Sequence, residues 1–165
     1  MGRGAASKKT VEPRFQNRSD NCHIAQLRTT MIGIQRVYKP VKRTDEQRFL
    51  VERLWPRGIK KAALHMTDWL KDVAPSDALR RWFNHDPAKW EEFQRCYRDE
   101  LDGKPETWRP LIKAAENGDV TLLFSAHDVE HNNAVVLKAY LDERLKRRKR
   151  PAAHGRMQLD SPNQT

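Results

Sequence analysis

The chain has 165 residues, 38% of them hydrophobic, and a net charge of +10 from 32 Lys and Arg against 22 Asp and Glu. This length suits one domain with its own core, and the lack of an apolar window of about 18 residues excludes a transmembrane helix. Two cysteines, Cys22 and Cys96, make no disulfide framework. Free thiols are typical of a reducing compartment, so we expect a cytoplasmic protein.

The positive charge is concentrated at the ends of the chain. Residues 31–145 hold 20 basic and 19 acidic residues, a net charge of +1. Within them, residues 36–61 hold nine basic and three acidic residues, which favours one anion-facing loop over a generally basic surface. Composition predicts three parts: a disordered basic leader at 1–30, an α/β domain at 31–146 and a disordered basic tail at 147–165.

The first two predicted strands are separated by a short charged connection. Ile32 and Ile34 begin the first strand, and the connection at 39–47 is too short for a helical crossover. Two arrangements therefore stay open: the strands are antiparallel neighbours, or their pairing is indirect.

The second strand leads into a loop rich in cations. Its apolar residues begin at Phe49, and Pro56 lacks a ladder donor, so we expect the strand to end at Trp55. Gly58 then permits a tight turn. Guanidinium groups beside such a turn offer paired donors to phosphate or carboxylate, and the cations around it are Arg53, Arg57, Lys60 and Lys61.

Helical patterns follow as far as residue 118. Thr67 is expected to cap a short helix at 68–73, and Ser76 one at 77–83. Asp86 and Pro87 start the next helix. Its apolar stripe, Trp90, Phe93, Tyr97 and Leu101, indicates a core helix, and another is expected from Thr107, with Pro110 in its first turn, to Gly118.

The run 120–124 is continuously apolar and predicts a strand buried on both faces, at the centre of the sheet. Asn132 or Asn133 can cap a last helix that ends in the basic run 146–150. Its inward residues are expected to be Val135, Val136, Ala139, Tyr140 and Leu141. Together these elements predict a single α/β domain with a small, mostly parallel or mixed sheet of about three to four strands flanked by helices.

Several of these segments resemble a known family. Residues 48–61, with their Trp-Pro-Arg-Gly sequence, 122–128 and 131–134 are similar to the YeaO-like branch of domain-of-unknown-function family 488, and the resemblance covers about 31–146. It implies a small α/β fold without an agreed activity, so it assigns no catalytic residue. Phe124 and His127 stand where the family pattern has Tyr and Lys.

Two predicted strand ends carry polar groups. In open α/β sheets, ligands bind beyond the carboxyl ends of strands, and the ends here are residues 55–58 and 125–128. If they lie side by side, an anion can sit between Arg57, the Ser125 hydroxyl and a helix start near Asn132. The candidate ligand-binding residues are Arg53, Trp55, Arg57, Gly58, Lys60, Ser125 and Asn132.

Other chemistry finds less support in the sequence. His127 and His131 are four residues apart, but no third ligand is evident, so we predict neither a metal nor a cofactor. His131 and Asp128 are the candidates for general acid or base catalysis, with helix capping as the alternative.

Three functions remain open. The first is binding of a small anionic, phosphate-bearing ligand at the Arg53–Lys61 loop, with or without a catalytic step. The second is a nucleic-acid-associated or regulatory module that contacts phosphates non-specifically through its basic tails, with no membrane partner. In the third, the motif serves only the fold.

Overall fold

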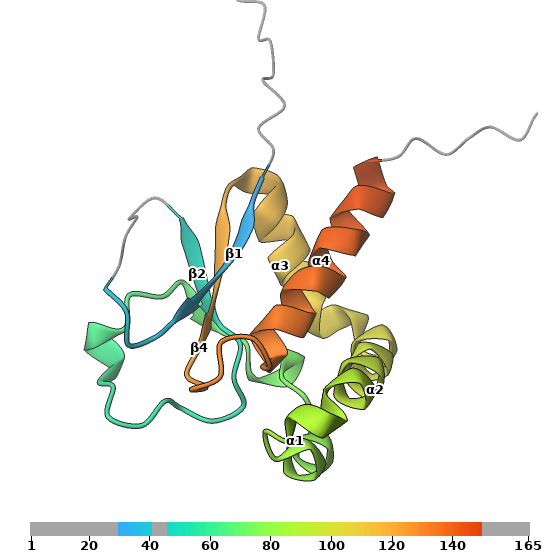
Figure 1. Ribbon diagram of the computed structural model, residues 1–165. Coiled ribbons are helices and arrows are strands. Elements are labelled where there is room, and N and C mark those ends of the chain that lie inside the picture. The colour runs from blue at the N-terminus through green and yellow to red at the C-terminus, as the bar shows by residue number, and fades with distance from the viewer. Residues whose placement is uncertain (1–29, 41–45, 150–165) are drawn as a thin grey trace, which may run out of the picture.

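The computed structural model describes residues 30–40 and 46–149, so the predicted leader up to residue 29 and the tail from residue 150 lie outside the described residues. Within them, four parallel strands form one sheet in the order β1-β4-β2-β3 (Figure 1). The strands are β1 (Ile32–Arg36), β2 (Gln47–Leu50), β3 (Asp68–Trp69) and β4 (Val120–Phe124). The predicted α/β class and parallel sheet are confirmed, and β4 is central and buried along its whole length.

The connection between β1 and β2 resolves the alternatives left by the sequence. Both strands run parallel to β4 and pair with it from opposite sides, at Ile34 with Leu122 and at Phe49 with the same Leu122. The antiparallel arrangement of the two strands is therefore wrong, and β1 and β2 are joined only indirectly, through β4. The apolar run of β4 predicts this arrangement, because a strand that is apolar on both faces belongs inside the sheet.

Two predicted segments near β2 differ in the structure. β2 ends at Leu50, and the last backbone bond to β4 runs from Val51 N to Leu123 O at 3.2 Å, so residues 52–55 are loop. The helix expected at 68–73 is replaced by β3 and a short 3-10 turn, η2 (Lys71–Val73). A six-residue helix is marginal by itself, whereas Leu70 N bonds to Leu50 O at 2.9 Å beside β2.

The helices follow their capping residues closely. Ser76 Oγ accepts the Leu79 N–H at 3.2 Å at the start of α1, and Asn132 Oδ1 accepts the Val135 N–H at 3.2 Å at the start of α4. The helices are α1 (Asp77–Phe83), α2 (Trp90–Gly103), α3 (Pro105–Asn117) and α4 (Asn133–Lys149), with short 3-10 turns at η1 (Lys61–Ala63) and η3 (Pro87–Lys89).

Two details of the helices correct the sequence interpretation. α3 begins at Pro105, not at Thr107, which places Pro110 inside the helix. α4 ends at Lys149, inside the basic run where its end is predicted, but it buries Leu137, and Ala139, which was expected to face inward, is exposed.

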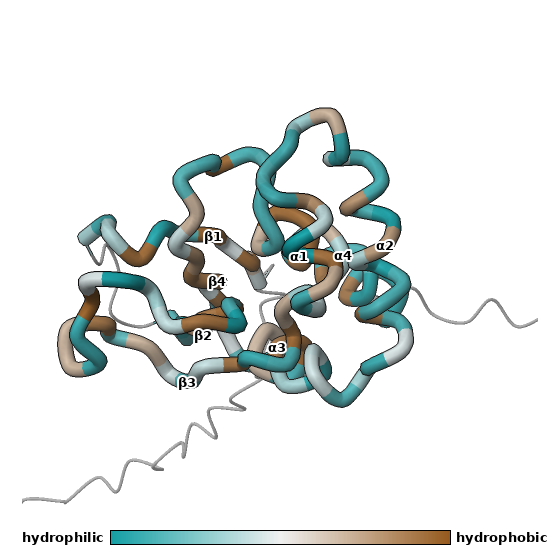
Figure 2. The backbone as a smooth tube through the Cα atoms, turned by 90° about the horizontal axis from the view of Figure 1, so that it is seen from below, coloured by the Kyte–Doolittle hydropathy of each residue, from teal (hydrophilic) through white to brown (hydrophobic). Residues whose placement is uncertain are grey.

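The two faces of the sheet are covered differently. α3 and α4 pack on one face, over a core that includes Phe49, Leu122 and Tyr97 (Figure 1). The other face carries Leu50 and Leu123, and the connection from residue 51 to 67 covers it through a second, smaller core with Leu64, Trp55, Ile59, Met66 and Trp69. Figure 2 shows the hydrophobic strands between these two layers. None of the helices in the described part is long and apolar enough to cross a lipid bilayer.

Candidate functional site

A cavity of about 530 Å³ opens at the carboxyl ends of the strands. We call it the strand-end pocket. One wall is the segment Glu52–Arg57 after β2, and a second is formed by Ser125 and Ala126 after β4 with Asn132 and Asn133 at the start of α4. The two loops singled out in the sequence therefore lie side by side. The remaining lining residues are Tyr38, Ala74, Pro75, Arg80, Arg81, Phe83, Asn84, His85 and Phe93.

Four arginines line the strand-end pocket. Arg53 contacts Asp72 at 3.3 Å and Arg80 contacts Asp77 at 3.1 Å, so each has a carboxylate partner. Arg57 and Arg81 are exposed, and neither guanidinium contacts a carboxylate among the described residues. They come from separate elements, the loop after β2 and helix α1. The lining of one cavity therefore includes two arginines whose guanidinium groups have no carboxylate partner among the described residues.

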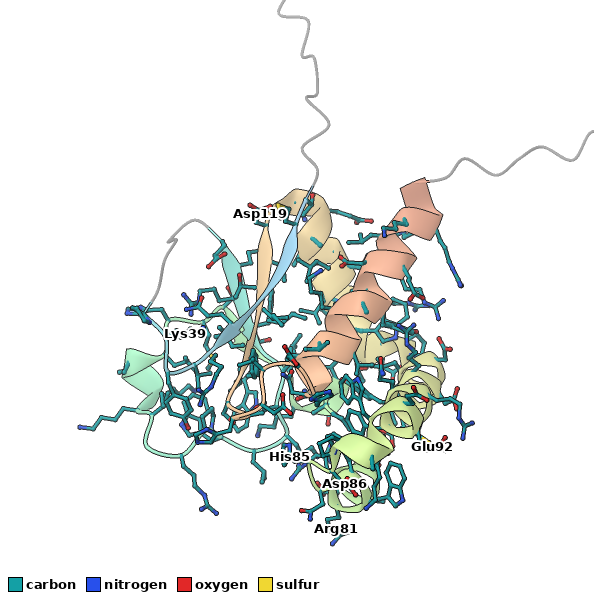
Figure 3. The ribbon with its side chains drawn as sticks, viewed as in Figure 1. Lys39, Arg81, His85, Asp86, Glu92 and Asp119 are labelled. Carbon is teal, nitrogen blue, oxygen red and sulfur yellow. The ribbon has the colours of Figure 1, made fainter. Side chains whose placement is uncertain are left out.

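Tyr38 holds the loop that carries Arg57, because its hydroxyl donates to the Arg57 carbonyl oxygen at 3.1 Å. Arg81 and His85 belong to the end of α1 and its following turn, below the sheet in Figure 3. Asn84 and His85 both have positive φ, 44° and 55°, which is uncommon for residues other than glycine. The sequence did not predict that this corner lies at the site.

An acidic side chain also lines the pocket. Ser125 donates its backbone N–H to Glu52 Oε1 and its hydroxyl to Glu52 Oε2, each at 2.6 Å. The Trp69 indole N–H donates to the Glu52 carbonyl oxygen at 2.6 Å. The Ser125 hydroxyl, expected to face a ligand anion, is therefore engaged by a carboxylate of the chain itself. Glu52 stands among cations without a motif of its own, so its place on the pocket wall was not predicted.

The start of α4 joins the two loops. Asn132 is 2% exposed, and besides its capping bond its Nδ2 donates to the Asp128 carbonyl oxygen at 2.9 Å. Asn133 Nδ2 donates to the Val51 carbonyl oxygen at 2.7 Å, which fixes the helix start to the end of β2. These amides fix the geometry of the pocket wall, because both are already bonded within the chain.

The other candidate residues of the first loop do not all line the pocket. Trp55 lines the pocket, but its indole N–H donates to the Ile59 carbonyl oxygen at 2.7 Å and its ring packs edge-on against Trp69. Gly58 has φ of 76° and forms the turn. Gly58 and Lys60 are not part of the pocket wall.

Asp128 and His131 form a local pair beside the pocket, and neither lines it. Asp128 Oδ1 accepts the N–H groups of Glu130 and His131, and His131 Nδ1 lies 2.8 Å from Asp128 Oδ2. The His131 and Glu130 backbone bonds lower the pKa of Asp128 to about 2. The carboxylate thus caps the turn before α4. Within the described residues, no group of three or more His, Cys, Asp or Glu side chains is placed to hold a metal ion.

Comparison with known proteins identifies the family. A family model described as the inactive DUF488-N3 subclade matches residues 31–162. The chain belongs to this family. The uncharacterized protein YeaO of Escherichia coli K12 is 38% identical over 110 residues, which cover 67% of this chain and 96% of YeaO. The uncharacterized protein Rv3073c of Mycobacterium tuberculosis H37Rv is 36% identical over 118 residues, 72% of this chain and 99% of the relative. No solved structure matches significantly.

The family match contains the whole strand-end pocket, whose lining residues run from Tyr38 to Asn133. The resemblance predicted from the Trp-Pro-Arg-Gly loop and the later strand is confirmed. The family description and the names of the relatives state no substrate or reaction.

Proposed function

We propose that this protein binds an anionic, phosphate-bearing ligand in the strand-end pocket. The observation that carries the proposal is the placement of Arg57 and Arg81, two exposed guanidinium groups without a carboxylate partner in the described part of the chain, on one cavity. Guanidinium groups bind phosphate oxygens through paired, charge-assisted hydrogen bonds.

Size and position support the proposal. A volume of about 530 Å³ is in the range of cavities that hold small organic ligands. The start of α4 lies on the pocket wall, and a helix start stabilises a nearby anion by about 0.3–1 kcal/mol. This contribution is small, so the arginines supply most of the affinity.

We propose a binding role without turnover, in a cytoplasmic setting. The family model carries the description inactive, and the catalytic candidates Asp128 and His131 lie outside the pocket wall. The free, partly buried thiol of Cys96 suits a reducing compartment.

The test is thermal unfolding with a panel of phosphate esters and nucleotides. The wild type is expected to gain stability with a subset of the panel, because a ligand that binds only the folded state raises its stability. Arg57→Ala and Arg81→Ala should each lose this gain.

Lys60→Ala is the matched control. It removes one positive charge from the same loop but not from the pocket wall, so it should keep the gain. Equal stabilisation of all three variants and the wild type would refute binding in the pocket and favour the basic tails. If no panel member stabilises the wild type, the proposal fails and the loop serves the fold alone.

A further inference from the structure

We infer that the ligand is a sugar phosphate, free or as part of a nucleotide, whose hydroxyl groups donate hydrogen bonds to Glu52. The inference rests on the proposed function and assigns a specificity-determining role to a residue that no motif marks.

A phosphate group fills a small part of a cavity of about 530 Å³, so the rest must receive an organic group. Apolar side chains are available to pack against it. Phe83 and Phe93 line the pocket with their rings stacked at 4.2 Å, and Pro75 and Ala74 are buried beside them.

Glu52 is the one acidic residue on the pocket wall among the described residues, and none of the four arginines there contacts its carboxylate. A carboxylate has about four acceptor positions on its two oxygens, and Ser125 occupies two of them. The remaining acceptor positions of the Glu52 carboxylate can bind only hydrogen-bond donors. Since an acceptor or anion placed against them would be repelled, the organic group must carry donors.

Of the charged residues that line the cavity, Glu52 is half-buried, whereas Arg57 and Arg81 are exposed to solvent. The phosphate therefore stays outermost, and the donor-bearing part points inward. Ser125 holds both carboxylate oxygens, so Glu52 is fixed before a ligand arrives.

Glu52 lies two residues after the end of β2, at the carboxyl edge of a parallel sheet. In dinucleotide-binding α/β folds, an acidic side chain of this kind binds a ribose hydroxyl group, while the phosphate sits on donors at a nearby helix start. A polyhydroxyl ring with a phosphate supplies both parts at a spacing that one small cavity can hold.

The experiment is calorimetric titration of the full chain with three probes: inorganic phosphate, ribose 5-phosphate, and tetrahydrofurfuryl phosphate, which keeps the ring but lacks the ring hydroxyls. The wild type should prefer ribose 5-phosphate over tetrahydrofurfuryl phosphate by about tenfold, the effect of one hydrogen bond to a charged group. A nucleoside 5′-monophosphate, as a fourth probe, shows whether a base adds further affinity, which distinguishes the two sources of the sugar phosphate.

Glu52→Gln should reduce this preference to about twofold or less, yet bind inorganic phosphate at least as well as the wild type, because it removes a negative charge from the pocket. Asp72→Asn is the matched control. It also removes one negative charge beside the pocket, on the partner of Arg53, but leaves the acceptor in place, so the preference should remain.

The outcomes separate the two proposals. If no probe binds the wild type, both the proposed function and this inference fail. If the phosphates bind but the wild type shows no preference for the hydroxyl-bearing ring, only this inference fails, and that comparison does not depend on any variant folding. A preference that persists in folded Glu52→Gln also overturns it.

Discussion

The contact between Glu52 and Ser125 joins the ends of β2 and β4, and its strength can be measured by removing the hydroxyl. Ser125→Ala deletes the 2.6 Å bond to Glu52 Oε2 but keeps the backbone N–H bond to Oε1. Hydrogen bonds to charged groups contribute about 1.5–3 kcal/mol, and water replaces part of this where both residues are half-buried. We expect a loss of about 1–2 kcal/mol in the free energy of unfolding.

Urea unfolding followed by tryptophan fluorescence measures this loss. The midpoint should fall while the slope with denaturant stays constant, because the change does not alter the surface exposed on unfolding. In the Glu52→Gln background, Ser125→Ala should cost less by about 1 kcal/mol, the coupling expected for residues in direct contact. A single variant as stable as the wild type, or additive costs, would show that the contact contributes nothing to stability.

Two further predictions concern the turns around the pocket. Gly58→Ala places a side chain at φ of 76° and should lower the free energy of unfolding, measured in urea, by about 1–2 kcal/mol. Gly103→Ala is the control: it lies at the end of α2 with open space for a methyl group, so it should be neutral or stabilising. Equal losses of stability in the two variants would refute the strain argument. The pKa of Asp128 is lowered from 3.8 to about 2, so the turn should gain stability from the ionised form above pH 3.8 and lose it as the pH falls towards 2. Asp128→Asn should remove this acid-dependent loss, and an Asp128 carboxyl that titrates near 4 by NMR would contradict it.

Local patterns predicted the elements whose signals are local. β4 follows from its unbroken apolar run, and α1 follows from Ser76 with an acid in the first turn. β3 could not be predicted, because its two residues are extended only through pairing with β2. The early end of β2 was missed for a related reason. Its apolar residues continue to Leu54, but the last backbone bond to β4 is made by Val51.

The site shows the same division between local sequence signals and contacts that depend on tertiary structure. The rule that ligands bind at strand ends brought together Arg57 and Ser125, which both line one cavity. Glu52 and Ser125 are 73 residues apart, so their contact has no sequence pattern. Arg81 and His85 reach the pocket only through the packing of α1, which depends on tertiary structure.

The segment that carries Arg57 is also the cover of a core. Trp55 and Ile59 lie against Leu50 and Leu123 on the sheet face opposite α3 and α4. A large displacement of this segment would expose those apolar side chains to water, which costs free energy in proportion to their area. A closing flap is therefore an unsuitable role for it. Ligands should enter a preformed cavity and leave the backbone nearly unchanged, so little of their binding energy is spent on ordering the protein.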